Sequence, residues 1–443
     1  MEAHRRRFLI WRLLSVASAA GAGLAGCRLE RVSPPRFDAG APEEAPPRRA
    51  DTTPPGMMPS TVAAPAVRPI RVLIVENAPQ FRVSLEGPYV VVDERGAVLR
   101  RGSDLPWTII RASADLSLGN QRLGVSTARV ITERSAALLV SAPLDDGSWS
   151  PQRRYDGALT VAVSDSRKLD AINVVDLDSY LTGVVPGECY PDWHYETYRA
   201  QAIAARTYAL YEMARTADDD FDVRATVASQ VYLGVPAGES GRRAAAAVQS
   251  TRGIVCTWTT PEGERIFPAF FSSCCGGMTQ DAANCKPIRS VPPLAGGVPC
   301  EYCRIAPGEV YRWKPLRLPK AEITTRIVQR YPVMSALGRV EDVQVLSQTS
   351  FGRNVRLRLV GSTGSAFDIQ AEDFRLAVGA ARMRSTDCRF AHDRDAIIFS
   401  EGRGFGHGMG LCQWGAQGQA LQGRSAAEIL QCYYPGSNFT RVY

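Results

Sequence analysis

The stretch "YETYRAQAIAARTYALYEMARTA", Tyr195 to Ala217, decides the fold of this 443-residue chain. It runs for 23 residues without Gly or Pro, and its middle, "AIAARTYAL", is small or apolar on every face. A helix that is apolar all round is a buried helix, so we predict a helix inside a globular core. Arg206 lies within it and must meet an anion or several carbonyl groups, because a lone buried charge is costly.

The preceding stretch, "GVVPGECYPDW", Gly183 to Trp193, puts Glu188 and Cys189 side by side. Its glycines and prolines predict a bend. A carboxyl group in a partly apolar pocket has a raised pKa and can serve as an acid. The other interpretations are a carboxylate at the start of the next helix, or a Cys189 nucleophile paired with His194 or His407.

The N-terminus has the pattern of a targeting segment. Residues 1–27 combine the basic "HRRRF" with an apolar run that ends in "LAGC", Leu24 to Cys27. This resembles a bacterial lipobox with a lipidated Cys27, and "RRRFLI" resembles a twin-arginine signal; an ordinary cleaved signal or a short anchor is the alternative. Residues 28–69, rich in Pro and Ala, predict an extended linker. We therefore expect an exported lipoprotein, anchored in a membrane and facing the periplasm or cell envelope.

The rest of the chain predicts an α+β fold. Short β-branched runs between turn residues indicate a β-rich lobe over residues 70–178. Residues 179–443 alternate helical and strand patterns and predict a mixed lobe packed against it. Hydrophobic residues make up 45% of the chain and charged residues 22%, which suffices for a large core. The net charge of +7 is compatible with an acidic polymer or surface, but no basic and aromatic run predicts nucleic acid binding.

Four separated segments, in order, carry a family resemblance. They are "YLTGVVPGECYPDWHYETYRAQAIAARTYAL", "SQVYLG", "AFFSSCCGGMT" and "GRGFGHGMGLCQWGAQGQALQGRSAAEILQCYYPGS". Together they resemble the SpoIID/LytB family of cell-wall proteins over residues 70–443, and four ordered motifs are far more specific than one Gly-rich loop. The resemblance implies a peptidoglycan ligand, because the better-studied members are lytic transglycosylases of glycan strands and others are described as amidase enhancers.

The resemblance places Glu188 at the position of the family's catalytic acid. A glycosidase that uses water commonly needs two carboxylates, whereas a lytic transglycosylase needs one. That group protonates the oxygen between N-acetylmuramic acid and N-acetylglucosamine, then takes the proton of the sugar's own C6 hydroxyl as a 1,6-anhydro ring closes. The alternatives are a non-catalytic glycan-binding scaffold that enhances a cell-wall amidase and, more remotely, a Cys189 wall peptidase.

The resemblance also implies substrate-binding positions. These are Gln201, Arg206, Tyr208, Ser229, Gln230, Tyr232, Ser272, His407 and Gln413. Each has a structural alternative: Arg206 as a buried ion pair, "SQVY" as a packing cluster at a strand edge, and His407 as a histidine bonded within the core.

The cysteines leave two interpretations. Eleven are present, and removing Cys27 leaves ten, an even number that favours disulfides in an exported protein. The alternative is a structural zinc site that includes Cys275, Cys300 and Cys303, since clustered thiolates suit tetrahedral Zn²⁺. The expected glycan chemistry itself requires no cofactor.

Overall fold

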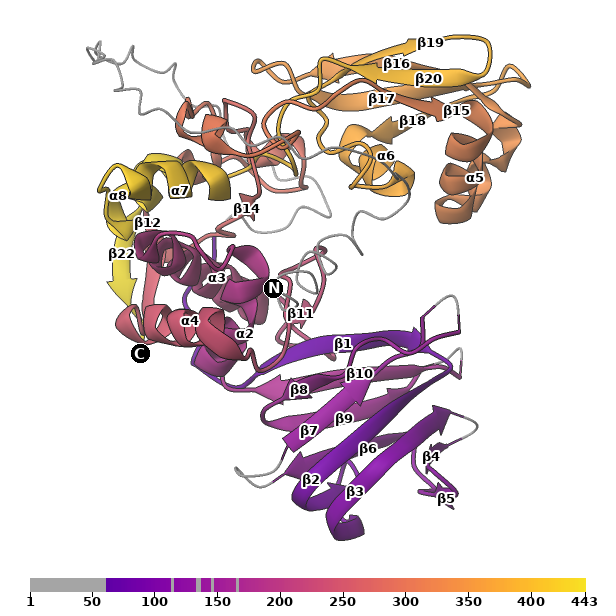
Figure 1. Cartoon of the computed structure of the whole chain (residues 1–443), viewed down its shortest axis with the longest axis vertical. Helices are drawn as coiled ribbons and strands as arrows, with labels where there is room; N and C mark the ends of the chain where they lie inside the picture. Colours follow the sequence, from indigo (N-terminus) through magenta and orange to yellow (C-terminus); the bar gives the residue numbers. More distant parts are fainter. Residues whose placement is uncertain (1–60, 113–114, 133–136, 145–146, 165–166) are drawn as a thin grey trace, which may run out of the picture.

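The structure is a computed structural model. It describes residues 61–112, 115–132, 137–144, 147–164 and 167–443 (Figure 1). The predicted signal segment, its Cys27 and most of the predicted linker lie outside these residues. Helices and sheets are both extensive, so the predicted α+β class is confirmed. Among the described helices, none is long and apolar enough to cross a membrane.

The N-terminal part of the described chain forms one large, mainly antiparallel sheet (Figure 1). Its strands are Ile70–Ala78 (β1), Gln80–Val92 (β2), Val98–Ala112 (β3), Leu116–Leu118 (β4), Gln121–Arg122 (β5), Thr127–Thr132 (β6), Ala137–Ser141 (β7), Arg153–Tyr155 (β8), Ala158–Val163 (β9), Leu169–Val175 (β10) and Val223–Arg224 (β11). They run in the order β11-β1-β10-β9-β6-β2-β3-β4-β5, and β7 pairs with β2 and β8. In the β1–β10 pair, near the β11 edge of the sheet, Ile70 lies opposite Val175.

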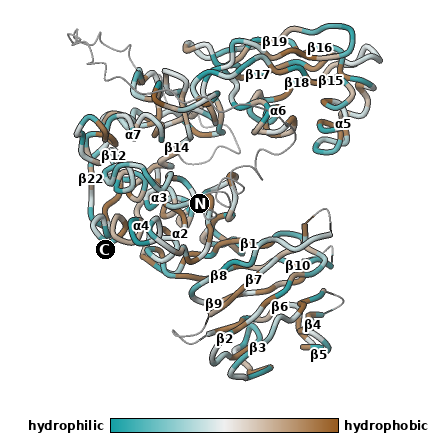
Figure 2. Tube along the Cα trace, viewed as in Figure 1, coloured by the Kyte–Doolittle hydropathy of each residue, from teal (hydrophilic) through white to brown (hydrophobic). Residues whose placement is uncertain are grey.

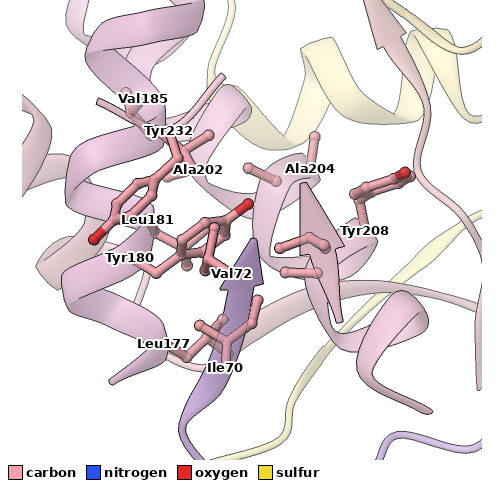
Figure 3. Close-up of a cluster of buried hydrophobic side chains, with 14 of the residues drawn as sticks. Ile70, Val72, Leu177, Tyr180, Leu181, Val185, Ala202, Ala204, Tyr208 and Tyr232 are labelled. Atoms are coloured by element: carbon pink, nitrogen blue, oxygen red, sulfur yellow. The ribbon is translucent and has the colours of Figure 1, made fainter. Parts of the chain in front are cut away.

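The chain leaves this sheet directly into the helical centre of the molecule. The helices there are Leu177–Glu188 (α2), Tyr195–Arg215 (α3), Gly238–Ser250 (α4), Gln413–Leu421 (α7) and Ala426–Tyr433 (α8). The predicted buried helix is confirmed as α3, whose residues from Ala200 to Met213 are all buried. Figure 3 shows residues of α2 and α3 packed with Ile70 and Val72 of β1. Helix α2 therefore connects the large sheet to the centre.

The segment before Glu188 is the main departure from the prediction. Instead of a bend, it forms the last turns of α2, with Pro186 inside the helix. Gly183 and Gly187 are there for close packing: a Cβ on Gly183 would lie 2.3 Å from the carbonyl oxygen of Gly234, and one on Gly187 would lie 2.6 Å from that of Val231. Because both glycines lie on one helix face, the segment around Val231 can pack directly against α2.

The buried charge of Arg206 is paired and hydrogen bonded inside the protein. Its side chain is fully buried and forms an ion pair with Asp178 at 3.1 Å. It also donates to the hydroxyl oxygen of Tyr443 at 3.0 Å and to the carbonyl oxygen of Thr251 at 2.9 Å. These bonds attach α3 to α2, to the end of α4 and to the C-terminal residue, which is the structural role that the sequence left open for Arg206.

Smaller sheets follow the centre. The first joins Ile254–Thr260 (β12), Gly263–Ile266 (β13) and Asn438–Arg441 (β22), and the second joins Phe271–Ser272 (β14) and Leu411–Cys412 (β21). Short 3-10 helices span Ala282–Asn284 (η1), Pro292–Leu294 (η2) and Tyr302–Ile305 (η3). The β14–β21 pair is parallel and sets Ser272 beside Cys412, so two of the predicted motifs meet there.

Residues 316–400 form a separate unit, here called the upper sheet lobe (Figure 1). Its elements are Leu316–Pro319 (β15), Lys320–Arg330 (α5), Pro332–Leu337 (η4), Val340–Gln348 (β16), Asn354–Gly361 (β17), Ala366–Gln370 (β18), Ala371–Val378 (α6), Arg389–His392 (β19) and Ala396–Ser400 (β20). Figure 2 shows hydrophobic residues recurring along the strands of this lobe and of the large sheet. The lobe has its own core, which includes Leu357, Phe374 and Phe399.

One buried arginine joins this lobe to residues 402–410, here called the Gly-rich segment. Arg353, just before β17, is fully buried. It donates to the carbonyl oxygen of Gly406 at 2.9 Å and to that of Cys275 at 2.8 Å. A Cβ on Gly408 would lie 2.7 Å from the Arg353 guanidinium carbon. The Gly-rich segment thus lies directly over a side chain of the upper sheet lobe.

Candidate functional site

Glu188 is the point where three separated motifs meet. It is the last residue of α2 and is partly exposed. The backbone N–H of Val231, in the "SQVYLG" segment, donates to its Oε1 at 2.9 Å. The side-chain amide of Gln413, the first residue of α7, donates to its Oε2 at 3.0 Å. Both carboxylate oxygens are therefore fixed by elements far apart in the chain.

The surroundings of Glu188 favour its protonated form. Desolvation raises the pKa of the Glu188 carboxyl above its ordinary value, and the hydrogen bonds from Val231 and Gln413 oppose that rise. Both of these partners are uncharged. Arg206, whose direct pairing would have lowered this pKa, bonds to Asp178 in the first turn of α2 instead. Glu188 thus keeps its proton to a higher pH than an exposed glutamate.

Gln201 and Trp414 extend the polar part of the site. Gln413 Nε2 also lies 3.4 Å from Gln201 Oε1, so predicted residues on α3 and α7 are in contact. In the described part of the chain, Gln201 Nε2 and the indole N–H of Trp414 are buried without a hydrogen-bond partner. Unpaired buried donors are uncommon in proteins. Here one belongs to Gln201, which contacts Gln413, and the other belongs to Trp414, which follows Gln413 in the chain. Trp414 lies in the same sequence motif as His407 and Gln413 but was not among the predicted substrate-binding residues.

Aromatic rings of these segments form two groups of contacts. Trp414 packs against Trp193 and Tyr190 with ring centroids 4.9 and 5.4 Å apart. Tyr208 and Phe270 form a second contact at 6.0 Å. Desolvation raises the pKa of Tyr208 well above its ordinary value, and Ser229 opposes part of that rise.

The Gly-rich segment presents His407. Its ring lies 6.1 Å from that of Phe270, and its Nδ1 accepts a hydrogen bond from the Met409 N–H at 3.0 Å. Desolvation lowers the pKa of His407 to about 3, with Glu372 opposing the shift. The imidazole is therefore neutral at physiological pH, with its proton on Nε2. The Ser272 hydroxyl accepts from the next backbone N–H, that of Gly408, at 3.2 Å and so holds the segment in place.

Three predicted substrate-binding residues are instead in the core. Arg206, Gln230 and Tyr232 are at most 1% exposed and, unlike the equally buried Gln201, have no unpaired side-chain donor among the described residues. Gln230 accepts from the Tyr180 hydroxyl, and the Tyr232 hydroxyl donates to Asn173. The structure contradicts direct contact of these side chains with a substrate, because their hydrogen bonds are made inside the protein. "SQVY" contributes the Val231 backbone N–H, which the sequence could not single out because every non-proline residue has one.

Cys189 does not have the surroundings of a nucleophile. It caps the C-terminus of α2 and is 5% exposed. Desolvation and the neighbouring Glu188 raise the pKa of its thiol well above the ordinary value. Because the thiolate is the reactive form, this position disfavours a cysteine peptidase.

The cysteines correct the expectation of disulfides. Cys189 and the nine cysteines after it are free thiols in the structure. Four of them converge: the Sγ atoms of Cys275, Cys300, Cys303 and Cys412 all lie within 4.8 Å of one another, and all four residues are buried. Three of these were the predicted zinc ligands. Cys412 was missed, because it lies in a different motif far along the chain.

A cavity of about 720 Å³ occurs elsewhere, at α5 and η4 of the upper sheet lobe. Its lining includes Thr324, Gln329 and Ser335 and none of the site residues above. Nothing in its lining repeats the chemistry around Glu188.

Comparison with known proteins agrees with the motifs. Residues 165–258 match the family model for stage II sporulation protein, SpoIID. An uncharacterized protein of Brachyspira hyodysenteriae is 27% identical over 368 residues, which cover 83% of this chain and 91% of that protein. The amidase enhancer of Bacillus subtilis is 26% identical over 59% of this chain but only 40% of its own length.

Stage II sporulation protein D of Bacillus subtilis is 25% identical over 287 residues, which cover 61% of this chain and 76% of that protein. The residues that match the family model include Glu188, Gln201 and Val231. On these findings, the chain contains a region that matches the SpoIID family and is similar to proteins named stage II sporulation protein D and amidase enhancer.

Proposed function

We propose that this protein is a cell-wall protein that cleaves peptidoglycan glycan strands as a lytic transglycosylase, with Glu188 as general acid and then general base. The observation that carries the proposal is the Glu188 carboxyl group itself. It is partly exposed, it has a raised pKa, and two uncharged donors fix its oxygens. A group that begins the reaction protonated needs this combination.

The proposed step requires one carboxyl group. The Glu188 proton passes to the glycosidic oxygen as the bond to C1 of N-acetylmuramic acid breaks. The C6 hydroxyl of the same sugar then bonds to C1, and its proton passes to Glu188. Atoms balance without water, and the acid is regenerated. Gln413 and the Val231 N–H stabilise the carboxylate present between the two transfers.

The comparisons also support a second candidate. One relative is named an amidase enhancer, so the same site would then bind glycan without cutting it and position a cell-wall amidase. Either proposal includes export and a lipid anchor at Cys27, which would place the protein in the cell envelope. The signal segment and Cys27 lie outside the described residues.

Analysis of reaction products separates these functions. The purified protein is incubated with glycan strands, with and without stem peptides, and the soluble products are identified by mass spectrometry. We expect fragments ending in 1,6-anhydro-N-acetylmuramic acid. Reducing ends would show hydrolysis instead, and loss of peptide cross-links would favour a peptidase. Glycan binding without any product would support the enhancer role and contradict the transglycosylase.

Gln413→Leu is expected to shift the pH dependence of cleavage. Gln413 donates to the ionised form of Glu188 and lowers its pKa, so its loss raises that pKa further. Activity falls as pH rises through the pKa of the acid, and the falling limb should therefore move to higher pH. A hydrogen bond to a charged group contributes about 1.5–3 kcal/mol, so a shift on the order of one pH unit is expected.

The matched control is Gln422→Leu, an exposed glutamine just after the same helix. Its pH profile should equal that of the wild-type protein. An unmoved limb for Gln413→Leu, or a shift to lower pH, would show that this contact does not set the titration of the acid.

A further inference from the structure

We propose that Cys275, Cys300, Cys303 and Cys412 together bind one structural Zn²⁺ ion. The proposal is independent of the glycan chemistry. Its first support is the donor set: four buried thiols whose sulfur atoms all lie within 4.8 Å of one another. Four sulfur ligands around one point are the typical arrangement of a closed, structural zinc site.

The sulfur separation fits a shared ion better than a disulfide. Cys275 Sγ and Cys303 Sγ are 3.8 Å apart. Two sulfurs that each lie about 2.3 Å from one tetrahedral Zn²⁺ are about 3.8 Å apart. In a disulfide the same atoms would be separated by about 2.05 Å.

Backbone groups around the cluster are arranged to receive thiolates. The N–H groups of Cys275 and Gly415 donate to Cys412 Sγ at 3.3 and 3.4 Å. Tyr433 Oη lies 3.0 Å from Cys300 Sγ. Donors of this kind orient metal-bound thiolates and offset their charge. Cys412 also caps α7, so its sulfur lies at the positive end of that helix.

Gly415 makes room for the sulfurs. A Cβ at this position would lie 2.6 Å from Cys300 Sγ and 1.9 Å from Tyr433 Oη. Any larger residue would displace both groups. The close approach of α7 to Cys300 therefore depends on a missing side chain, as expected where a helix packs directly onto a ligand cluster.

The ion would join segments that are far apart in the sequence. Cys275 follows β14, Cys300 and Cys303 belong to the loop containing η3, and Cys412 ends β21. Gln413, the donor to Glu188, is bonded directly to Cys412 in the chain. A metal held here fixes the start of α7 and, through it, the position of that donor.

The test is the metal content of the full chain. Protein purified without added chelator is examined by native mass spectrometry and by elemental analysis. We expect about one zinc per chain, since a four-thiolate site holds one ion. Cys412→Ser should lose at least tenfold in zinc retained against a competing chelator. Cys388→Ser is the matched control, because it removes an equally buried thiol from the upper sheet lobe core and should retain zinc.

Other outcomes would overturn the proposal. A chain without metal whose thiols are paired as disulfides would reject the site, and iron in place of zinc would reject the assigned ion. Unchanged zinc in a folded Cys412→Ser protein would reject this ligand set. If Cys412→Ser does not fold, Co²⁺ is added to the metal-free wild-type protein. The absorption of a tetrahedral four-thiolate cobalt site would support the proposal, and its absence would contradict it.

Discussion

Glu188→Gln is expected to abolish formation of 1,6-anhydro products while leaving the protein folded. General acid–base groups contribute about 10²–10⁴-fold to rate, and an amide cannot donate a proton to the leaving oxygen. The replacement has the same shape. Its carbonyl oxygen can still accept from the Val231 N–H, and the Gln413 amide can turn to present its own oxygen to the new NH₂ group. Product yield by mass spectrometry and circular dichroism of the variant together test this.

Two variants serve as controls for that result. Glu239→Gln removes a carboxylate that lies exposed at the start of α4 in an ion pair with Arg242, and it should leave product formation unchanged. Cys189→Ser should also retain activity, since a buried, protonated thiol takes no part in the proposed step. If Glu188→Gln kept more than about a hundredth of the wild-type rate, Glu188 would not be the acid, because loss of an acid–base group costs at least about 10²-fold.

Removal of the proposed zinc should lower the unfolding temperature sharply. A ligand present at a thousand times its Kd stabilises the folded state by about 4.1 kcal/mol, and structural zinc sites in small peptides reach about 10–16 kcal/mol. For a unit of 150–250 residues each kcal/mol corresponds to about 2–4 °C, so a decrease of about 10 °C or more is expected. The measurement is thermal unfolding followed by circular dichroism, before and after dialysis against a chelator.

Added Zn²⁺ should restore the original midpoint, and Mg²⁺ should not, because thiolates select softer metals. The Cys388→Ser protein should respond to chelation as the wild type does. An unchanged midpoint after proven loss of the metal would mean that the cysteine cluster is held by packing alone.

The sequence predicted those elements whose local signals agree with their packing. Helix α3 has no Gly or Pro and is apolar all round, and the strands of the large sheet have β-branched runs between turns. In both cases burial and local propensity favour the same conformation. Arg206 was likewise identified as a buried charge in need of partners, although Asp178 and the other partners could be located only in three dimensions.

Helix α2 was missed because its sequence signals have a second meaning. Gly183, Pro186 and Gly187 usually indicate a bend, but the two glycines here let Gly234 and Val231 approach the helix surface. Long-range packing overrides local propensity at this point. The same packing brings the Val231 N–H to Glu188. The sequence therefore identified Glu188 as a candidate acid but could not predict the helix that carries it.

The cysteine cluster illustrates a different limit. Spacing alone drew attention to Cys300 and Cys303, because nearby pairs are conspicuous in a sequence. Cys412 joins them only through the parallel pairing of β14 with β21. A ligand contributed by tertiary pairing leaves no local pattern, and an even count of ten cysteines, together with the expectation of export, favoured disulfides instead.

The burial of Arg353 bears on how the protein can be divided. Excision of residues 316–400 would remove the guanidinium under the Gly-rich segment and leave the carbonyl oxygens of Gly406 and Cys275 without their donor. Although the upper sheet lobe has its own core, it is not a detachable module. A shortened protein that retained every residue around Glu188 would still lack the Arg353 contact that supports the segment containing His407.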